Sequence, residues 1–190
     1  MATEEKFGSA LSFARAFLSI HQDVDSRVLS AEKLCWLLYF FLRDHVARTQ
    51  EFPFWTRIQC DDVTISIPAV MRNFKTLRAK LNRDILPYLP RLTQVYYRYG
   101  ALARWRMREI YYTMPSFWSC VLSQAKRPVS PQKLTQEHLR QDAKTVTQDA
   151  FKPLDPPIVY QRICARRAAM RGQRYRICYQ KAERIGNNPN

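Results

Sequence analysis

The sequence predicts a mainly α protein with one short β-strand or ribbon, and three observations lead to this prediction. Apolar residues recur at helical spacing in several long segments. Only 4 glycines occur among 190 residues, too few for an all-β fold with many tight turns. Residues 62–67 alternate between polar and apolar side chains, which is the two-residue period of a strand. The chain length suits one main domain with a small appendage.

Two apolar helices are expected in the first quarter of the chain. A stripe from Phe7 to Leu18 has helical spacing, and the polar stretch His21–Ser26 ends it. Ser30 is a favourable N-cap for a second helix over Ala31–Arg48. This second helix contains the apolar run Leu34–Leu42. Because it is apolar on nearly every side, we interpret it as the central core helix, and a subunit interface is compatible with that interpretation.

Two further features follow from this helix. His45, near its end, is interpreted as a solvated or capping residue. The apolar segment Phe52–Trp55 is expected to form a loop that presses onto the helix.

A strand and a basic helix are expected next. Val63, Ile65 and Ile67 alternate with polar residues, and Pro68 suits the first turn of a helix because it lacks an N–H. The predicted helix covers Ala69–Leu81. Its apolar face consists of Val70, Phe74, Leu77 and Leu81.

A polar-faced strand that runs through a proline into a basic amphipathic helix resembles the opening of the ribbon-helix-helix DNA-binding family. The resemblance covers residues 62–81 and extends loosely to larger bacterial and plasmid-borne regulators, including activators of conjugative transfer. It implies that Asp62–Ile67 pairs with its copy in a second chain and enters the major groove, with Thr64 and Ser66 facing base edges. The chain departs from the family pattern at Asn82–Pro90, which has two prolines and no glycine. The predicted fold class is thus a mainly helical domain in which a ribbon-helix-helix-like element is embedded.

An intrachain hairpin is the alternative for the same strand. Residues 56–60 also alternate, and a two-residue turn at Asp61 and Asp62 would pair Cys60 with Val63 and Ile58 with Ile65. Asp-Asp suits a type I′ turn poorly, so the intermolecular ribbon is favoured. The outer face of the hairpin would carry Arg57, Gln59, Thr64 and Ser66.

A long helix is predicted over Leu92–Thr113. Its far side presents Arg104, Trp105 and Arg108, whereas Arg106 falls within the apolar stripe without an explanation. From Val70 to Tyr112 the chain has ten Lys or Arg and two acidic residues, a charge that suits phosphate contacts.

The chain is expected to divide into three parts. Residues 1–123 form the helical core domain, and residues 124–157 form a linker with one modest helix from Thr135 to Ala150. Residues 158–190 form a basic C-terminal helix and tail.

The net charge of +15 favours a nucleic-acid partner over an anionic membrane. The predicted function is a sequence-specific double-stranded DNA-binding transcriptional regulator acting as a homodimer. One alternative is a protein that binds RNA or single-stranded nucleic acid through Trp105 and the arginines, and another is a basic structural component of a nucleoprotein assembly. The predicted contact residues are Arg57, Gln59, Thr64, Ser66, Arg72, Lys75, Arg104, Arg108, Arg162, Arg166, Arg167 and Arg171.

Other classes are excluded by missing patterns. No nucleotide-binding glycine motif, nucleophile elbow or paired carboxylates are present, so we expect no catalysis, no cofactor and no small-molecule substrate. Five scattered cysteines and three histidines form no zinc signature. The N-terminus has no apolar signal segment and the longest apolar run is too short to cross a bilayer, so we expect a soluble cytoplasmic protein, nucleoid-associated if bacterial.

Overall fold

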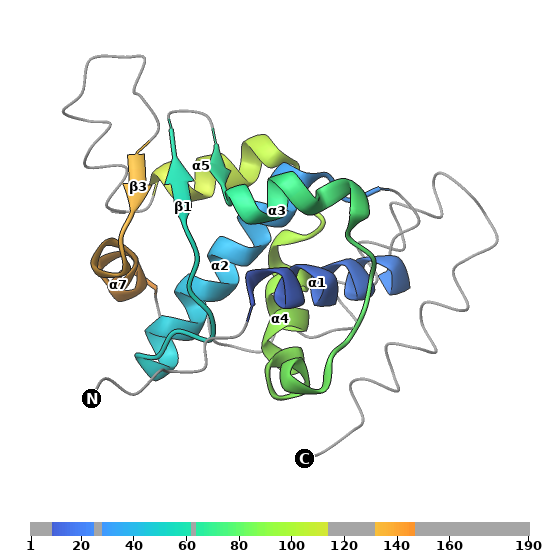
Figure 1. The fold of residues 1–190 in the computed structure, drawn as a ribbon. Helices are drawn as coiled ribbons and strands as arrows, with labels where there is room; N and C mark the ends of the chain where they lie inside the picture. The colour runs from blue at the N-terminus through green and yellow to red at the C-terminus, as the bar shows by residue number, and fades with distance from the viewer. Residues whose placement is uncertain (1–8, 25–27, 62–63, 114–131, 147–190) are drawn as a thin grey trace.

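The computed structural model describes residues 9–24, 28–61, 64–113 and 132–146. Helices surround one buried helix, and a three-stranded antiparallel sheet lies near the top of the view in Figure 1. The helices are α1 (Ala10–Val24), α2 (Ala31–Thr49), α3 (Pro68–Asn73), α4 (Leu89–Tyr99), α5 (Arg104–Thr113) and α7 (Gln136–Lys144), with 3₁₀ turns η1 (Phe74–Thr76) and η2 (Arg83–Tyr88). The strands are β1 (Ile58–Cys60), β2 (Ile65–Ser66) and β3 (Gln132–Leu134). The predicted mainly helical class with a small β element is confirmed.

The buried helix is α2, as the sequence predicts. Every residue from Leu34 to Val46 is buried. Helices α1, α4 and α7 and strand β2 all pack against it. Its start is set by Ser30, whose Oγ accepts a hydrogen bond from the backbone N–H of Lys33 at 3.2 Å.

An aromatic cluster joins α1 to α2. The ring of Phe13 lies 5.3 Å from that of Phe41 and 4.8 Å from that of Phe54, measured between centroids. Tyr88 closes the cluster with an edge contact to Phe13 at 5.2 Å. Phe54 is fully buried and packs on Phe13 of α1, so the 52–55 loop lies on the core, whereas its expected contact was with the helix over 31–48. Such aromatic pairs add about 0.5–1.5 kcal/mol beyond the area they bury.

The segment around β2 forms an intrachain hairpin, which is a correction to the favoured intermolecular ribbon. Strand β2 pairs antiparallel with β1, and Cys60 lies opposite Ile65. Asp61 and Thr64 flank the reversal of the chain, because the Asp61 N–H donates to the Thr64 carbonyl at 3.1 Å and Asp61 Oδ1 accepts from the Thr64 N–H at 2.7 Å. The predicted pairing of Cys60 with Val63 across a two-residue turn at Asp61 and Asp62 is therefore wrong. The register differs by two residues from the predicted one, so the same side chains face the core.

The basic helix after Pro68 is shorter than the predicted range of 69–81. Helix α3 ends at Asn73 and continues only as the η1 turn. Side chains compete for the backbone there, since Asn73 Nδ2 donates to the Ala69 carbonyl at 2.8 Å and Thr76 Oγ1 to the Asn73 carbonyl at 2.9 Å. Of the predicted apolar face, Val70 and Leu77 are buried, Phe74 is half-buried and Leu81 is exposed.

The predicted helix Leu92–Thr113 is two helices. Helix α4 ends at Tyr99, and Gly100 is its C-cap, with its N–H donating to the Tyr96 carbonyl. Helix α5 begins at Arg104 in a new direction (Figure 1). The break explains Arg106, which is exposed and pairs with Glu109 at 2.5 Å.

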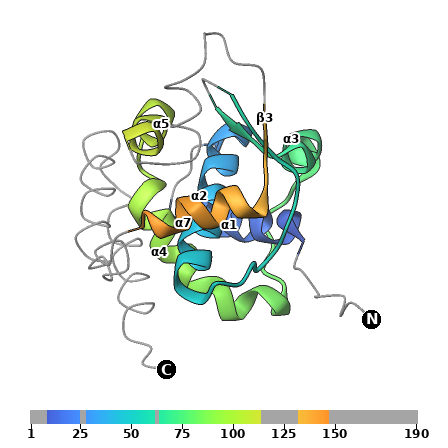
Figure 2. The same cartoon turned by 90° about the vertical axis from the view of Figure 1, so that its left-hand side faces the viewer.

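The segment predicted to be a linker adds a strand and a helix to the domain. Strand β3 pairs with the outer edge of β1, and α7 lies across α2 (Figure 2). Thr135 caps α7 as predicted, in a capping box with His138, and the helix ends at Lys144 rather than Ala150. Residues 147–190 and the N-terminal residues 1–8 lie outside the described part of the chain.

One buried hydrogen bond attaches α7 to the core. The Tyr39 hydroxyl donates to Asp142 Oδ2 at 2.8 Å, and these residues are 0% and 1% exposed. Burial, then Tyr111 and Asp142, raise the pKa of Tyr39 well above its ordinary value, so its hydroxyl stays protonated and acts as donor.

No helix within the described ranges is long and apolar enough to cross a bilayer.

Replacing Gly100 with alanine tests the break between α4 and α5. In one continuous helix the change would stabilise the protein by about 1 kcal/mol. In the structure, the new Cβ would lie 2.5 Å from the Tyr96 carbonyl oxygen and 2.9 Å from its ring. The Tyr96 hydroxyl is bonded to His21 Nδ1 at 2.7 Å, so the ring cannot yield easily. We expect Gly100→Ala to lower the urea midpoint, and a higher midpoint would contradict the break.

Replacing Tyr39 with phenylalanine tests the attachment of α7. The change leaves a buried Asp142 oxygen without this donor, so we expect a loss of about 1–3 kcal/mol in unfolding free energy by urea titration. Tyr112→Phe is the matched control, because it removes a 2.8 Å bond to the Asp61 carbonyl at a half-buried position where water can substitute. Equal losses in both variants would argue against a special role for the Tyr39 bond.

Candidate nucleic-acid interface

The exposed face of the sheet carries a polar row that crosses all three strands. Ser66 on β2 lies opposite Gln59 on β1, and Gln59 lies opposite Lys133 on β3. Lys133 is exposed, and Ser66 and Gln59 are half-buried. We call these three residues the sheet row. The opposite face consists of the buried residues Ile58, Cys60, Ile65 and Leu134.

Two other predicted contact residues lie beside the sheet row. Arg57 is exposed and precedes β1 by one residue, with the same alternation as Gln59. Thr64 lies in the turn, because β2 begins only at Ile65. Its N–H donates to Asp61 Oδ1 at 2.7 Å and the hydroxyl of its half-buried side chain donates to the Ile65 carbonyl at 3.2 Å, so both groups form bonds within the hairpin.

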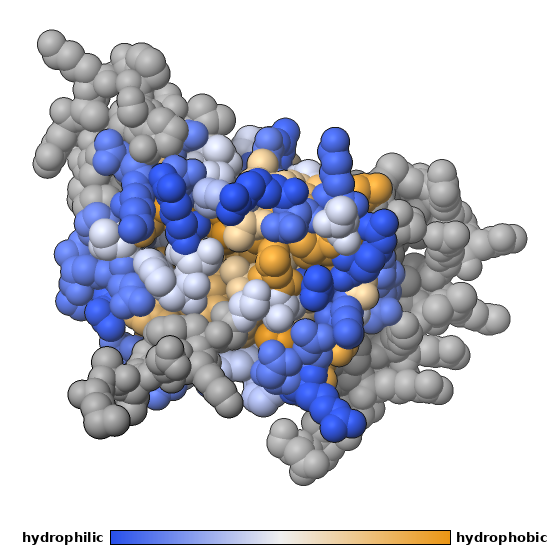
Figure 3. Space-filling model, viewed as in Figure 1, coloured by the Kyte–Doolittle hydropathy of each residue, from blue (hydrophilic) through white to orange (hydrophobic). Residues whose placement is uncertain are grey.

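A basic segment follows β2 directly, with only Ile67 between the strand and α3. Residues 68–91 have six Lys or Arg and one acidic residue, Asp84. Both predicted contact residues here, Arg72 and Lys75, are exposed. Hydrophilic residues gather over the sheet and α3 on the face drawn in Figure 3. We call residues 68–91 the α3 segment. Its exposed cations are Arg72, Lys75, Arg78, Lys80 and Arg83.

The arginines of α5 contact side chains of the same chain. Arg104 forms an ion pair with Glu32, at the start of α2. The guanidinium of Arg108 lies 5.4 Å from the centre of the Tyr112 ring. Exposed pairs of this kind contribute at most about 1 kcal/mol, so a phosphate can compete for these guanidinium groups.

Trp105 projects from α5 into solvent. It is 68% exposed, whereas Met107 and Tyr111 on the same helix are fully buried. A large exposed aromatic side chain between arginines is typical of surfaces that stack nucleobases.

The sequence did not indicate Lys133, Arg78 or Lys80 as contact residues. Lys133 was missed because β3 has three residues and pairs with a strand more than 70 positions earlier, which no local pattern reveals. Arg78 and Lys80 were assigned to a helix that ends before them. Of the predicted contact residues, Arg162, Arg166, Arg167 and Arg171 lie outside the described residues.

The chain matches no protein-family model, no curated protein and no solved structure.

Metal binding and thiol chemistry find no support in the described ranges. No group of three His, Cys, Asp or Glu residues there is placed to hold a metal ion. Burial raises the pKa of the Cys35 thiol to about 11, and burial also raises the pKa of Cys60. Both groups are therefore protonated thiols at neutral pH.

His45 is buried, which corrects its predicted role as a solvated or capping residue. It is 6% exposed, and its ring packs against Phe41 and Tyr88. Arg91 Nη1 donates to His45 Nδ1 at 2.9 Å, so the imidazole is neutral with its proton on Nε2. Burial, then the charges of Arg91 and Arg48, lower the pKa of His45 to about 4.

The lowered pKa predicts a loss of stability in acid. Between pH 6.5 and about 4 the unfolded chain takes up a proton at His45 and the folded chain does not, so this part of the stability is complete above pH 6.5 and is lost as the pH falls. We expect the wild-type protein to lose up to about 3 kcal/mol more unfolding free energy from neutral pH to pH 4 than His45→Gln does. Denaturant titrations across this range measure the difference, and parallel pH profiles would contradict a neutral His45.

Proposed function

We propose that the protein binds nucleic acid, with duplex DNA as the preferred ligand, through the sheet row and the α3 segment. The observation that carries the proposal is their adjacency. An outward row of a hydroxyl, an amide and an ammonium group lies beside exposed cations that follow β2 in the chain. The sheet row suits contacts to base edges, and the exposed cations suit contacts to phosphates.

The chemistry of the sheet row fits direct readout. The major groove admits a two-stranded β-ribbon, and a glutamine can pair bidentately with adenine N6 and N7. Gln59 is central in the row, Ser66 can donate or accept, and Lys133 can donate to guanine O6 or N7. Because β1 and β2 form the hairpin within one chain, this mode of binding needs no second copy.

The α3 segment would supply affinity that does not depend on base sequence. Five exposed Lys or Arg residues lie within twelve positions, from Arg72 to Arg83, with no acidic residue among them. Phosphate contacts by such cations release counterions, so binding should weaken steeply with salt.

A second candidate ligand is single-stranded nucleic acid or RNA, and the exposure of Trp105 favours it. An indole between arginines offers a stacking surface for an unpaired base. The homodimer and the role in transcription stay predictions. A homodimer would use the outer edge of β2, since β1 takes the other edge.

Binding measurements on two variants test the proposal. A random duplex pool enriched by wild-type protein provides the preferred sites. We expect Gln59→Ala/Ser66→Ala to bind those sites about tenfold more weakly and random duplex nearly unchanged. We expect Arg72→Gln/Lys75→Gln to weaken both duplexes alike and to lower the slope of log affinity against log salt by about two.

Arg140→Gln is the control, because it removes one exposed positive charge on α7, where the guanidinium lies 5.1 Å from the centre of the Phe52 ring. It should leave both the preference and most of the salt slope intact. If the loss per charge removed is the same in Arg140→Gln and in Arg72→Gln/Lys75→Gln, net charge, and not this surface, governs binding. Tighter binding to single strands that Trp105→Ala abolishes would replace the duplex proposal with the second candidate.

A further inference from the structure

A small pocket lies between the C-terminal half of α2 and α4, away from the sheet row. In Figure 1 these parts of the two helices lie in the lower half of the view, whereas the sheet lies at the top. Its volume is about 20 Å³, enough for one water-sized group. The polar residues that line it are Asp44, His45, Arg48, Arg91, Gln94 and Arg98.

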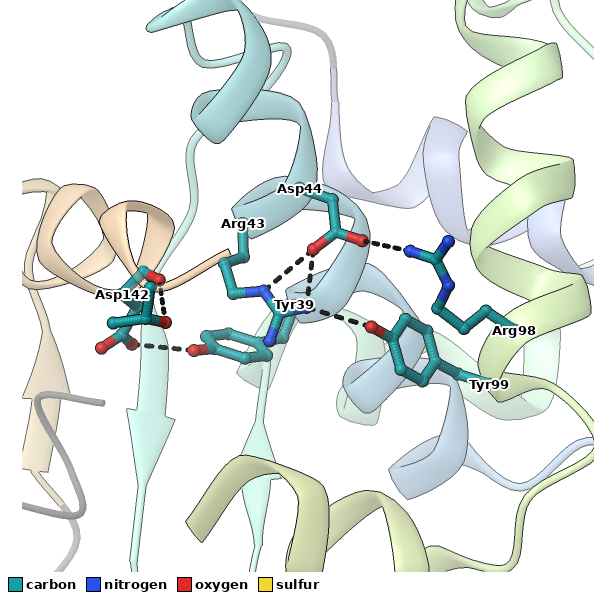
Figure 4. Close-up of polar contacts among 7 residues, drawn as sticks. Tyr39, Arg43, Asp44, Arg98, Tyr99 and Asp142 are labelled. Carbon is teal, nitrogen blue, oxygen red and sulfur yellow. Dashed lines mark hydrogen bonds and ion pairs between the residues drawn. The ribbon is translucent and has the colours of Figure 1, made fainter. Parts of the chain in front are cut away.

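The lining is strongly positive. Three arginines, Arg48, Arg91 and Arg98, face one carboxylate, that of Asp44. Asp44 Oδ1 already accepts bonds from Arg43 Nε at 2.9 Å and Nη2 at 2.6 Å. Its Oδ2 lies 3.9 Å from Arg98 Nη1 (Figure 4). The residues that line the pocket therefore include three positively charged side chains and one negatively charged side chain.

Two neighbours hold the arginines in place. Arg91 donates to His45, and His45 is wedged between the Phe41 and Tyr88 rings at centroid distances of 5.7 and 5.4 Å. His45 is neutral at physiological pH and adds no charge. Arg98 contacts Asp44, which the buried Arg43 fixes. Arg91 and Arg98 are thus positioned before any ligand arrives, which lowers the entropic cost of binding.

We propose that this pocket binds the oxygens of a phosphate group, with Arg48, Arg91 and Arg98 as donors. Guanidinium groups match phosphate geometry through paired N–H donors, and the half-buried Gln94 amide adds a neutral donor at the rim. The volume admits an oxygen of the anion but not a nucleobase or sugar ring. The ligand is therefore inorganic phosphate, or a phosphate group that a larger molecule presents at the mouth.

The first experiment uses inorganic phosphate alone, so it does not depend on the proposed nucleic-acid function. The full chain, labelled with ¹⁵N at arginine, is titrated with sodium phosphate at constant ionic strength. We expect the Nε–Hε signals of Arg91 and Arg98 to shift saturably in the low-millimolar range. Arg91→Gln/Arg98→Gln should bind at least tenfold more weakly.

Two further variants guard against a folding defect. Arg91→Lys keeps the charge but loses the paired donors, so it should bind with intermediate affinity. Arg140→Gln loses one charge elsewhere and should bind phosphate as the wild type does. No saturable shift in the wild-type protein, or equal weakening in Arg140→Gln and Arg91→Gln/Arg98→Gln, would overturn the proposal.

A second pair of titrations identifies the source of the phosphate. Oligonucleotides with a 5′-phosphate or a 5′-hydroxyl are compared on the wild type and on Arg91→Gln/Arg98→Gln. A preference for the 5′-phosphate that the double variant loses would support the pocket with a strand end as its ligand. Equal binding of both oligonucleotides, with the inorganic phosphate response intact, would support the pocket with a small phosphorylated ligand.

Discussion

The burial of α2 on all sides is the constraint on which the rest of the structure depends. A helix that is apolar around its whole circumference has to be covered around its whole circumference, and several elements of the described chain share that task, among them α1, α4, α7 and β2. Helix α1 contributes the aromatic cluster around Phe13, and α4 and α7 cover two other sides. Strand β2 covers a fourth, which places the sheet row on the outside of the molecule. The candidate interface is thus a consequence of how α2 is buried.

The same burial explains why polar groups deep in the protein are paired. Arg43 is 2% exposed, and a buried charge is tolerated only with a partner and hydrogen bonds. Its guanidinium bonds to Asp44 and to the Tyr99 hydroxyl at 3.1 Å, which ties α2 to α4 (Figure 4). Although burial opposes the charge of Arg43, Asp44 and the hydroxyls of Tyr99 and Tyr39 raise its pKa. In the same way, the hydrogen bond from Tyr39 to Asp142 ties α2 to α7.

Three groups of cations in the described ranges lie in environments with different chemical consequences. Those of the α3 segment are exposed, and Asp84 is the one acidic residue among positions 68–91, so they suit extended phosphate contacts. Those of α5 are engaged with Glu32, Glu109 and an aromatic ring. Those of the α2–α4 pocket line one small cavity and suit a single phosphate group. The net charge of +15 indicates an anionic partner, but only this division indicates where each kind of contact can form.

Local signals in the sequence predicted several of the elements but did not predict which elements pack together. The Ser30 and Thr135 caps, the buried α2 and the alternation before Pro68 depend on residues a few positions apart, so the sequence alone determined them. The pairing of β1 with β3, the burial of His45 and the placement of Lys133 depend on segments that meet only after folding. The break at Gly100 belongs with these, because the apolar spacing continues across it. The spacing of apolar residues in the sequence shows which face of an element is apolar. The tertiary structure decides which other element covers that face and which polar groups then lie on the surface.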